Sequence, residues 1–236
     1  MNFKFSKYLF LIFFLILLYL FFYPKVLLLS FDTEAPTTKE EMNMLLDLLN
    51  KYNYSSTFFV TLDFVNMNPE LIERMINENH EIACHTKSHK DLTKLNYNEV
   101  ITEINECKIY IEQNFNTKIY GFRAPYRKLD VSSFYALKSL NFTYDASIFE
   151  YYSFAYTPLI KEILTSTFLF IPLDDYICLK FIKIPKNIYF FMLNNYFNPY
   201  KSYSFHTHII MNYKNDFESF LKSQNSKKIT HKEFIA

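Results

Sequence analysis

The sequence predicts an α/β protein in which parallel strands alternate with helices. Short apolar runs of strand length recur along the chain, and capping residues and apolar side chains at helical spacing follow several of them. Repeated β-then-α units imply parallel strands with right-handed crossovers, so either a doubly wound sheet or a barrel fits. No internal repeat or low-complexity linker divides residues 25–236, which indicates a single domain of catalytic size.

The composition describes a folded domain and excludes several functions. Half of the 236 residues are hydrophobic, which is enough apolar surface to exclude a disordered chain. The chain has 25 basic and 24 acidic residues, so no electrostatic feature indicates a nucleic-acid partner. Gly121 is the only glycine, which excludes a glycine-rich phosphate loop. Three cysteines without close spacing indicate buried thiols, not a disulfide framework.

Residues 1–24 differ from the rest of the chain. Tyr8 to Tyr23 is an unbroken apolar run that would form a helix of roughly 25 Å, slightly shorter than the ~30 Å bilayer core. Lys4 and Lys7 precede this run, which favours a cytoplasmic N-terminus and an extracytoplasmic domain. A cleaved signal peptide is the alternative, but no small-x-small cleavage site follows. We therefore expect an N-terminal membrane anchor over 1–24 and a catalytic domain over 25–236.

The elements after Pro24 follow from local patterns. Residues 25–31 form a continuous apolar run, as expected for a strand covered on both faces. Two helices begin with a capping box, at Thr38 with Glu41 and at Asn96 with Glu99, and Asn68 followed by Pro69 predicts the start of another. The remaining predicted elements are strands over 56–60, 81–84, 118–122, 142–144, 168–172, 180–184 and 202–206 and a helix over 131–140.

Polar side chains follow several of the predicted strands. Asp32 and Glu34 come after the first strand, and their spacing in an extended chain directs both carboxylates to the same side. His85 and His89 follow the third strand, and a separation of four residues lets two imidazoles bind one metal ion. The other candidates at strand ends are Arg123, Pro125, Tyr126, Asp145, His206 and His208.

Each of these groups also has a purely structural interpretation. An isolated HxxxH is more often a pair of surface histidines, and an acidic pair can simply favour the positive end of a following helix. Their joint appearance at strand ends favours a site, because ligands of parallel α/β folds bind at the carboxyl ends of the strands. Two imidazoles and one carboxylate also form the three-ligand set that catalytic zinc uses.

Five motifs, in order along the chain, resemble those of a known family. They are SFDTEA at 30–35, HTKSH at 85–89, FRAPYR at 122–127, YDASIF at 144–149 and FHTH at 205–208. With them, the chain from about Lys25 to Met211 resembles the polysaccharide deacetylases, which are NodB-like carbohydrate esterases of family 4 type. The resemblance implies a distorted (β/α) barrel of about seven parallel strands and metal-dependent removal of acetyl groups from N-acetylated sugars.

The first motif departs from the common pattern of the family. Many members have two adjacent aspartates, and here the second position is Thr33, whose hydroxyl is a poor zinc ligand. A subgroup has two acids separated by one residue, and Asp32-Thr33-Glu34 is similar to that form. The resemblance then implies that Asp32 is the general base and that Glu34 binds the metal beside His85 and His89.

The resemblance also implies roles for the other candidates. Arg123 would keep Asp32 ionised, the backbone N–H of Tyr126 would stabilise the oxyanion, and His206 would donate a proton to the leaving amine. Asp145 would keep His206 protonated, and His208 is the competing proton donor. Pro125, Tyr126 and Phe149 would contact the substrate, with Phe149 in place of the family's usual tryptophan. The expected metal is Zn²⁺, with Co²⁺, Ni²⁺ and Mn²⁺ as alternatives.

The expected function is therefore the release of acetate from an N-acetylated cell-surface or cell-wall glycan. One alternative is a metal-dependent hydrolase of small cyclic amides or ureides, and another is a non-catalytic glycan-binding protein with the same fold. The predicted anchor favours a polymer at the cell surface. No pattern in the sequence indicates an oligomeric state.

Overall fold

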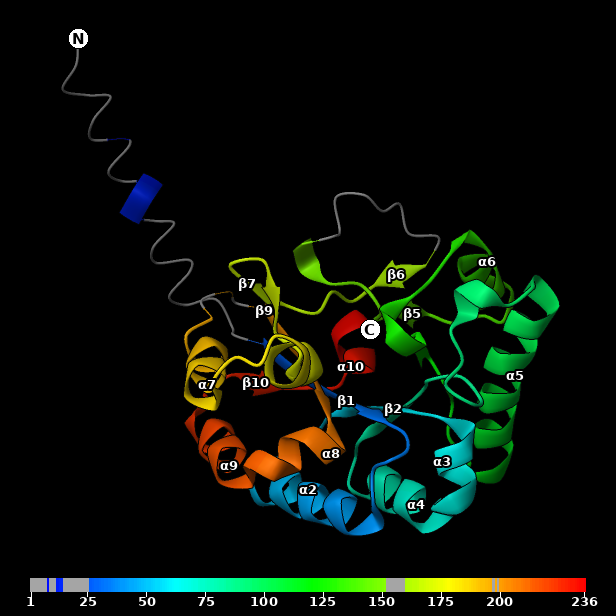
Figure 1. Ribbon diagram of the computed structural model, residues 1–236, viewed down its shortest axis with the longest axis horizontal. Helices are drawn as coiled ribbons and strands as arrows, with labels where there is room; N and C mark the ends of the chain where they lie inside the picture. The colour runs from blue at the N-terminus through cyan, green and yellow to red at the C-terminus, as the bar shows by residue number, and fades with distance from the viewer. Residues whose placement is uncertain (1–7, 9–11, 15–25, 152–159, 197, 199) are drawn as a thin grey trace.

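A curved sheet of parallel strands forms the centre of the computed structural model, which describes residues 8, 12–14, 26–151, 160–196, 198 and 200–236 (Figure 1). Seven strands follow one another in the order β9, β1, β2, β3, β4, β5, β6, all paired in parallel. They are β1 (Val26–Thr33), β2 (Thr57–Val60), β3 (Glu81–Cys84), β4 (Gly121–Phe122), β5 (Tyr144–Asp145), β6 (Lys161–Glu162) and β9 (Tyr200–His206). The expected number and direction of strands are confirmed, in the form of a half-barrel.

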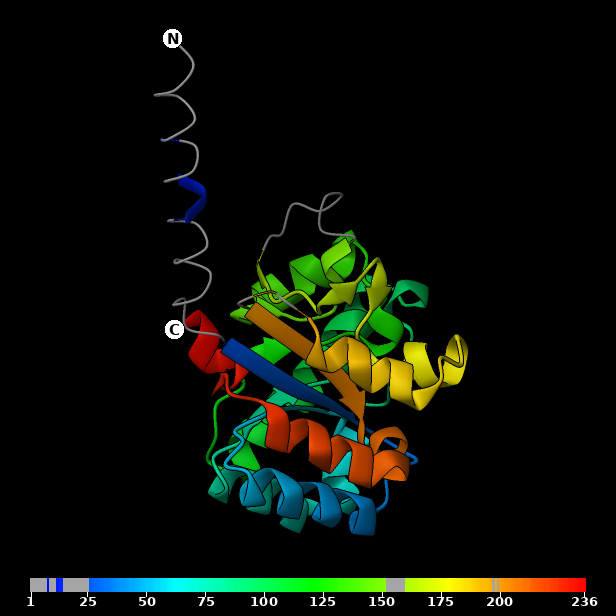
Figure 2. The same ribbon diagram turned by 90° about the vertical axis from the view of Figure 1, so that its left-hand side faces the viewer.

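One further strand lies at the start of β1. The two residues of β10 (Lys227–Lys228) pair with Val26 and Leu27, and β2 pairs with the later part of β1. Figure 2 shows β1 and β9 running side by side, as their seven paired residues require. The first strand of the chain is therefore paired with strands from its last quarter.

Helices cover the outer surface of the half-barrel, with α2, α4 and α5 along one side and α7 and α9 along another (Figure 1). The α-helices are α2 (Lys39–Lys51), α3 (Leu62–Met67), α4 (Pro69–Asn77), α5 (Tyr97–Asn114), α6 (Val131–Ser139), α7 (Lys186–Asn194), α8 (Thr207–Ile210), α9 (Lys214–Ser223) and α10 (His231–Ile235). Short turns of other helical types are η1 (Leu92–Lys94), η2 (Pro125–Arg127), η4 (Tyr176–Phe181) and η5 (Met211–Tyr213).

The strands β1, β2 and β3 are buried on both faces, as the continuous apolar runs predict. Leu27 and Leu29 of β1 belong to the large core between the sheet and the helices. Leu28, between them, belongs to a second core inside the half-barrel, together with Phe59 and Tyr144. Because successive side chains of a strand point to opposite faces, both cores draw on the same short strands.

The C-terminal helix α10 lies inside the half-barrel, at the amino-terminal ends of its strands (Figure 1). His231 is fully buried, and its Nδ1 lies 3.0 Å from Oγ1 of Thr57, the first residue of β2. The backbone N–H of Lys232 donates to Oε2 of Glu81, the first residue of β3, over 2.8 Å. This end of the barrel is thereby filled, and the carboxyl ends of the strands remain available for a site.

The single glycine has a packing function in β4. A Cβ atom at Gly121 would lie 2.0 Å from Cζ of Tyr144, far inside van der Waals contact. The Tyr144 ring crosses this point to donate its hydroxyl to Oε1 of Glu81 over 2.9 Å. A side chain at position 121 would therefore displace a buried tyrosine from its hydrogen bond.

Several sequence predictions need correction. The strands expected over 118–122 and 142–144 shorten to β4 and β5. Residues 168–172 do not form a strand of the parallel sheet, because β7 (Thr167–Phe168) and β8 (Ile171–Pro172) make a separate antiparallel hairpin. The strand expected over 180–184 is wrong, since η4 and a turn occupy those residues.

All three predicted helix starts are confirmed, with Asn68 as N-cap and Pro69 as first residue of α4, but only two of the three N-caps form side-chain hydrogen bonds. Thr38 with Glu41 and Asn96 with Glu99 form complete capping boxes. The Asn68 side chain does not cap α4, because its Nδ2 instead donates to the carbonyl of Phe64 at the end of α3. Cys84, Cys107 and Cys178 are buried and free, as expected.

The expected anchor over 1–24 lies almost wholly outside the described residues. Of that segment the structure describes only Tyr8 and residues 12–14, which are helical. No helix within the described part of the chain is long and apolar enough to span a bilayer. The anchor stays a prediction.

Candidate active site

A pocket of about 440 Å³ opens at the carboxyl ends of β1, β3 and β9. Its lining includes eight residues predicted from the sequence: Asp32, Glu34, His85, His89, Tyr126, Phe149, His206 and His208. The other lining residues are Ala35, Pro36, Arg127, Asp174, Tyr176 and Ile177. Separate segments of the chain therefore meet where the parallel fold predicts a site.

Glu34, His85 and His89 form a group that can hold a metal ion. One ligand atom from each residue lies within 4.8 Å of the other two. His85 Nε2 is 3.8 Å from Glu34 Oε2, and His89 Nε2 contacts the same oxygen. That oxygen is buried and has no hydrogen-bond donor among the described residues. A buried carboxylate oxygen facing two imidazole nitrogens fits a divalent cation, which would satisfy it.

His85 is held in the form that a metal ligand requires. Its Nδ1 lies 2.7 Å from the carbonyl oxygen of Arg123, which can only accept a hydrogen bond. Nδ1 therefore carries the proton, and Nε2 presents a lone pair toward Glu34. Burial lowers the pKa of His85 to about 4, against the opposing charges of Asp32 and Glu34, so the ring is neutral at pH 7.

The loop between the two histidines is fixed by Glu103 of α5. The Glu103 carboxylate accepts hydrogen bonds from the backbone N–H and hydroxyl of Ser88, at 3.0 and 2.8 Å. Its backbone carbonyl accepts from the N–H of Lys87 at 2.8 Å. His89 itself has a positive φ of 57°, a costly conformation for a residue with a side chain. The hydrogen bonds that Glu103 accepts therefore hold a strained loop in the shape that brings His89 close to His85.

Thr33, which stands where many members of the family have a second aspartate, is not part of the pocket. Thr33 is fully buried, its hydroxyl donates to the carbonyl of Phe31, and it is not part of the pocket lining. Asp32 and Glu34, on either side, both line the pocket. Alternation along β1 thus directs the two acids to the site and the threonine away from it.

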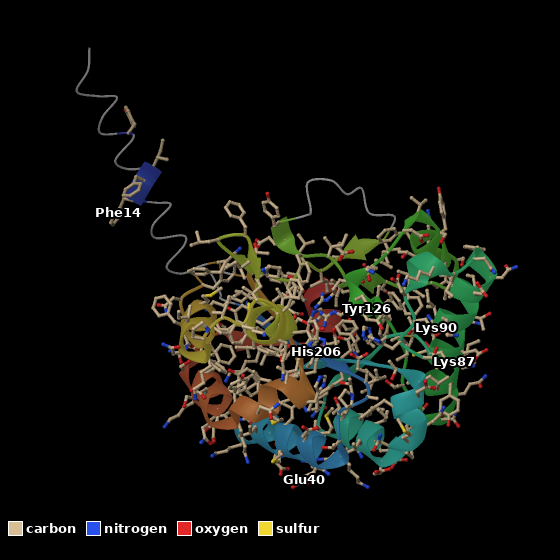
Figure 3. All side chains as sticks on the ribbon, in the orientation of Figure 1. Phe14, Glu40, Lys87, Lys90, Tyr126 and His206 are labelled. Carbon is tan, nitrogen blue, oxygen red and sulfur yellow. The ribbon has the colours of Figure 1, made fainter. Side chains whose placement is uncertain are left out.

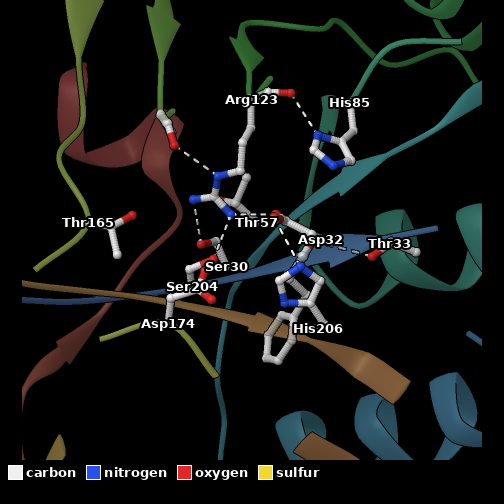
Figure 4. A network of polar contacts seen from close by, with 12 residues as sticks. Ser30, Asp32, Thr33, Thr57, His85, Arg123, Thr165, Asp174, Ser204 and His206 are labelled. Atoms are coloured by element: carbon white, nitrogen blue, oxygen red, sulfur yellow. Dashed lines mark hydrogen bonds and ion pairs between the residues drawn. The ribbon is translucent and has the colours of Figure 1, made fainter. Parts of the chain in front are cut away.

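Asp32 forms a buried ion pair with Arg123, as expected. Arg123 Nη1 lies 2.6 Å from Asp32 Oδ1, and both side chains are almost completely buried (Figure 4). The other donors of Arg123 are used as well: Nε donates to Ala146 O at 2.9 Å and Nη2 to Ser30 Oγ at 2.8 Å. Burial, the largest single influence, would raise the pKa of Asp32, but the charge of Arg123, together with those of His85, Arg127 and His206, holds the pKa well below its usual range.

His206 lies on the other side of Asp32, and its partner is Asp175. Nε2 of His206 is 3.8 Å from Asp32 Oδ2, and Nδ1 is 2.9 Å from Asp175 Oδ1. The backbone N–H of His206 also donates to both oxygens of Asp175. Burial lowers the pKa of His206, but the hydrogen bond and charge of Asp175 raise it by more, so the ring carries a proton at neutral pH.

The expectation that Asp145 keeps His206 protonated is therefore corrected, because Asp175 is the carboxylate at His206 Nδ1. Asp145 is fully buried below the pocket, is not among its lining residues, and accepts a hydrogen bond from Ser147 instead. Pro125, expected to contact the substrate, is likewise buried and does not line the pocket. Tyr126, next to it, is 61% exposed, and its ring centroid lies 4.8 Å from that of His89. Figure 3 shows Tyr126 and His206 near the centre of the molecule in that view.

His208 also reaches the pocket, although β9 ends at His206. Residues 207–210 form the short helix α8. His206 and His208 therefore differ in backbone conformation and do not share one face of a strand. Burial and the charge of His206 lower the pKa of His208. Its Nδ1 is buried without a partner among the described residues. The two rings therefore differ in charge state at neutral pH.

Sequence analysis missed a second arginine of the site, Arg127, which is partly buried and lines the pocket. Its Nη1 donates to Ala146 O at 2.8 Å and its Nη2 lies 3.4 Å from Asp174 Oδ2. The guanidinium also lies over the ring of Phe149, 5.0 Å from its centroid. Arg127 immediately follows the FRAPY segment, and the paired aspartates at 174 and 175 lie between two predicted strands. The basic residue directly after FRAPY was the available sequence signal for Arg127. The two adjacent aspartates, in a segment otherwise rich in apolar residues, were the signal for Asp175.

A parallel half-barrel with ionisable side chains at the carboxyl ends of its strands is the arrangement of an enzyme of the α/β class. Comparison with known proteins identifies the family. Residues 22–144, just over half of the chain, match the family model for polysaccharide deacetylase. The chain belongs to the polysaccharide deacetylase family.

Individual relatives support this assignment. The chain is 38% identical over 99 residues to the peptidoglycan-N-acetylmuramic acid deacetylase PdaC of Bacillus subtilis, a match that covers 42% of this chain and 20% of that enzyme. The chain thus spans about a fifth of the length of this curated relative.

Solved structures share the fold. The structure of Bacillus subtilis PdaC superposes with a TM-score of 0.68 at 20% identity, covering 90% of each chain. A family 4 carbohydrate esterase pseudoenzyme from Bacillus anthracis superposes with a TM-score of 0.67 at 16% identity, covering 90% of this chain and 66% of the other. The fold alone is therefore compatible with both an enzyme and a pseudoenzyme, and the side chains of the pocket must decide between them.

Proposed function

We propose that this protein is a metal-dependent hydrolase that removes N-acetyl groups from a cell-surface or cell-wall glycan and releases acetate. The observation that carries the proposal is the presence, in one pocket, of a three-residue metal group, an ionised aspartate and a protonated histidine. Hydrolysis of an amide requires a base for the attacking water and an acid for the leaving amine. Asp32 and His206, whose Oδ2 and Nε2 atoms lie 3.8 Å apart in the pocket, are proposed to supply these two functions.

The chain's own residues have distinct functions in this proposal. Asp32, kept ionised by Arg123, accepts the proton of the attacking water. His206, kept protonated by Asp175, donates a proton to the amine nitrogen as the C–N bond breaks. The backbone N–H of Tyr126 is proposed to stabilise the oxyanion, since a fixed donor has no reorganisation cost. Phe149 and the exposed ring of Tyr126 are proposed to form walls for the sugar.

Glu34, His85 and His89 would hold the metal. Bound there, a divalent ion would polarise the acetamide carbonyl and lower the pKa of a coordinated water. We propose Zn²⁺, because two imidazoles and a carboxylate with an open position are typical of catalytic zinc. Co²⁺, Ni²⁺ and Mn²⁺ accept the same ligands and are the alternatives to test.

The substrate and location are part of the proposal. The names of the relatives support N-acetylated glycans, including peptidoglycan, as the substrate class. The apolar run at Tyr8–Tyr23 supports a membrane anchor with the catalytic domain on the extracytoplasmic side. This arrangement would hold the pocket near the glycans of the cell surface.

The test is acetate release from an N-acetylglucosamine oligomer and from peptidoglycan fragments, with metal content measured on the same samples. Asp32→Asn should lower kcat by at least ~100-fold while metal is retained, because it removes only the base. His85→Ala should lose both metal and activity. The matched control is Glu106→Gln, on the exposed face of α5 and paired with Lys87, which should behave like the wild type.

The rival interpretation is a non-catalytic glycan-binding protein. One solved structure with the same fold is described as a pseudoenzyme, which makes this interpretation a concrete alternative. It predicts metal or glycan binding without acetate release. Thr33→Asp distinguishes the ligand assignments: if Glu34 is the ligand, an acid at the buried position 33 should destabilise the fold and give no gain in activity. A gain in acetate release would contradict the assignment of Glu34. Turnover of a cyclic amide in place of a glycan would support the small-molecule alternative.

A further inference from the structure

Two carboxyl groups outside the pocket are in contact with each other. Asp145 and Glu162 are neighbours in the parallel pairing of β5 and β6, and their side chains are within hydrogen-bonding distance. Asp145 is fully buried. Asp145 Oδ2 and Glu162 Oε2 are both buried, and neither has another hydrogen-bond partner among the described residues. The YDASIF motif singled out Asp145, and the proposed reaction does not use it.

Such a contact is stable only if a proton lies between the two groups. Two buried carboxylates at this distance would repel each other, and each would lack a donor. Burial raises the pKa of both groups, and the charge of Asp145 raises that of Glu162 further. The cation near Glu162 is Arg127, whose charge lowers the pKa of Glu162, but Arg127 also pairs with Asp174 over 3.4 Å and does not neutralise two further carboxylates. The nearby phenols of Tyr144 and Tyr200 are neutral, because burial raises their pKa.

The pair is connected to the catalytic loop through Ser147. The Ser147 hydroxyl donates to Asp145 Oδ1 over 2.7 Å and accepts from the backbone N–H of Ala124 over 2.8 Å. Glu162 Oε1 accepts from the backbone N–H of Ile148 over 3.0 Å. Ala124 directly follows Arg123, whose guanidinium holds Asp32. The carboxyl pair thus fixes the segment after β5 against the loop that carries Arg123 and Tyr126.

We propose that Asp145 and Glu162 share one proton, and that through Ser147 this pair positions the loop from Arg123 to Tyr126. Asp145 is then a positioning residue, not a catalytic one. The shared proton is a property of the fold, whereas the effect on turnover rests on the proposed deacetylase function. The two parts are tested by different measurements.

The first measurement is the infrared spectrum, which requires no turnover. The wild type should show the carbonyl band of a buried protonated carboxylic acid at neutral pH. Asp145→Asn and Glu162→Gln should both lose it, because an amide N–H replaces the shared proton and the remaining carboxylate is ionised. Glu106→Gln should keep the band. A wild-type spectrum without this band overturns the shared proton.

The second measurement is the kinetics of acetate release. Asp145→Asn and Glu162→Gln keep a donor between the side chains and should retain kcat within ~3-fold. Asp145→Ala breaks the connection and should lower kcat at least ~10-fold, with a smaller change in KM. If Asp145→Ala fails to fold, Ser147→Ala interrupts the same connection while both carboxyl groups stay in place, and it should lower kcat several-fold.

The outcomes separate the two parts. Unchanged kcat in both Asp145→Ala and Ser147→Ala overturns the positioning function, even if the infrared band is present. A wild-type protein that releases no acetate removes the reaction and with it the positioning function, while the infrared result still decides the shared proton.

Discussion

The histidines of the pocket differ in charge because their neighbours differ. His85 is buried with a carbonyl at Nδ1, and it is neutral. His208 is half-buried beside a positively charged ring, which lowers its pKa. His206 has a carboxylate at Nδ1, and this raises its pKa. A metal ligand must be neutral and a general acid must be protonated, so these surroundings assign His85 to the metal and His206 to proton donation.

The assignment of His206 predicts a pH dependence. In Asp175→Asn the carboxylate charge that raises the pKa of His206 is lost and the hydrogen bond at Nδ1 becomes one to a neutral amide, whereas burial, which lowers the pKa, remains and only the charges of Asp174 and Asp32 still oppose it. The protonated ring is then lost at lower pH, so the alkaline limb of kcat/KM should move down by at least ~1 pH unit. His208→Gln should leave that limb in place. The opposite pattern, a shift in His208→Gln alone, would make His208 the proton donor.

At the scale of the element, a helix positions the proposed metal ligands that follow a strand. Both histidines of the proposed metal group lie in the loop after β3, and the buried carboxylate of Glu103 on α5 holds that loop. The helix itself begins with a complete capping box, so its register relative to the loop is well defined. The shape of the loop therefore depends on how α5 packs against β3.

Weakening this contact should weaken metal binding. Glu103→Ala removes the acceptor for two donors of Ser88, and the zinc dissociation constant should rise ~10-fold or more, as for other groups that orient metal ligands. Competition with a chromophoric chelator measures the change. Glu103→Gln keeps one acceptor oxygen and should lie between Glu103→Ala and the wild type. Unchanged affinity in Glu103→Ala would show that the loop holds its shape alone.

The sequence predicts elements well where the signal is local. Capping boxes fix the starts of α2 and α5, and continuous apolar runs find β1, β2 and β3. The segment at 180–184 is rich in apolar residues, as a strand is, but a strand also needs a free edge to pair with, and composition does not reveal one. Phe181 there is 78% exposed at the end of η4.

The site was predictable to the same extent. Residues next to strong strands, such as Asp32 and His85, were placed correctly because the carboxyl ends of parallel strands converge. The partner of His206 was not, since Asp145 and Asp175 both follow apolar segments and only tertiary packing brings one of them within 2.9 Å.

Gly121 permits a specific prediction within β4. A methyl group there meets the Tyr144 ring, so Gly121→Ala should lower the free energy of unfolding by about 2–4 kcal/mol, in the upper range for overpacking in a core. Urea denaturation measures this loss. Because the conflict lies at the end of the tyrosine ring, Gly121→Ala combined with Tyr144→Leu should lose less than the sum of the single variants. Full additivity would mean that the backbone, not the ring, is displaced.

At the scale of the whole molecule, the half-barrel has one filled end and one open end. Helix α10 fills the amino-terminal end of the strands, where its Lys232 N–H satisfies Glu81 and its His231 ring stacks on Tyr144 with centroids 5.9 Å apart. The pocket occupies the other end. The interior between them is continuous through Phe59, whose ring lies 5.6 Å from His231 and 4.0 Å from the Arg123 guanidinium.

Removal of α10 should therefore affect the entire domain. Deletion of residues 231–236 leaves Glu81 with fewer donors and opens a void beside Phe59, so the free energy of unfolding should fall by several kcal/mol, on the order of a large cavity. The melting temperature should drop in a single transition, since one sheet shares both cores. A deletion variant with wild-type stability would show that α10 only occupies the barrel without supporting it.

The pairing of β1 has a consequence for how the chain matures. Among the paired strands of this sheet β1 is the first along the chain, yet two of its three neighbours, β9 and β10, begin at Tyr200 and Lys227. Such long separations along the chain delay closure until the late segments are available. Nascent polypeptide that has not reached residues 200–228 cannot complete the pairing of β1, so the sheet acquires its native topology only after those residues have been synthesised.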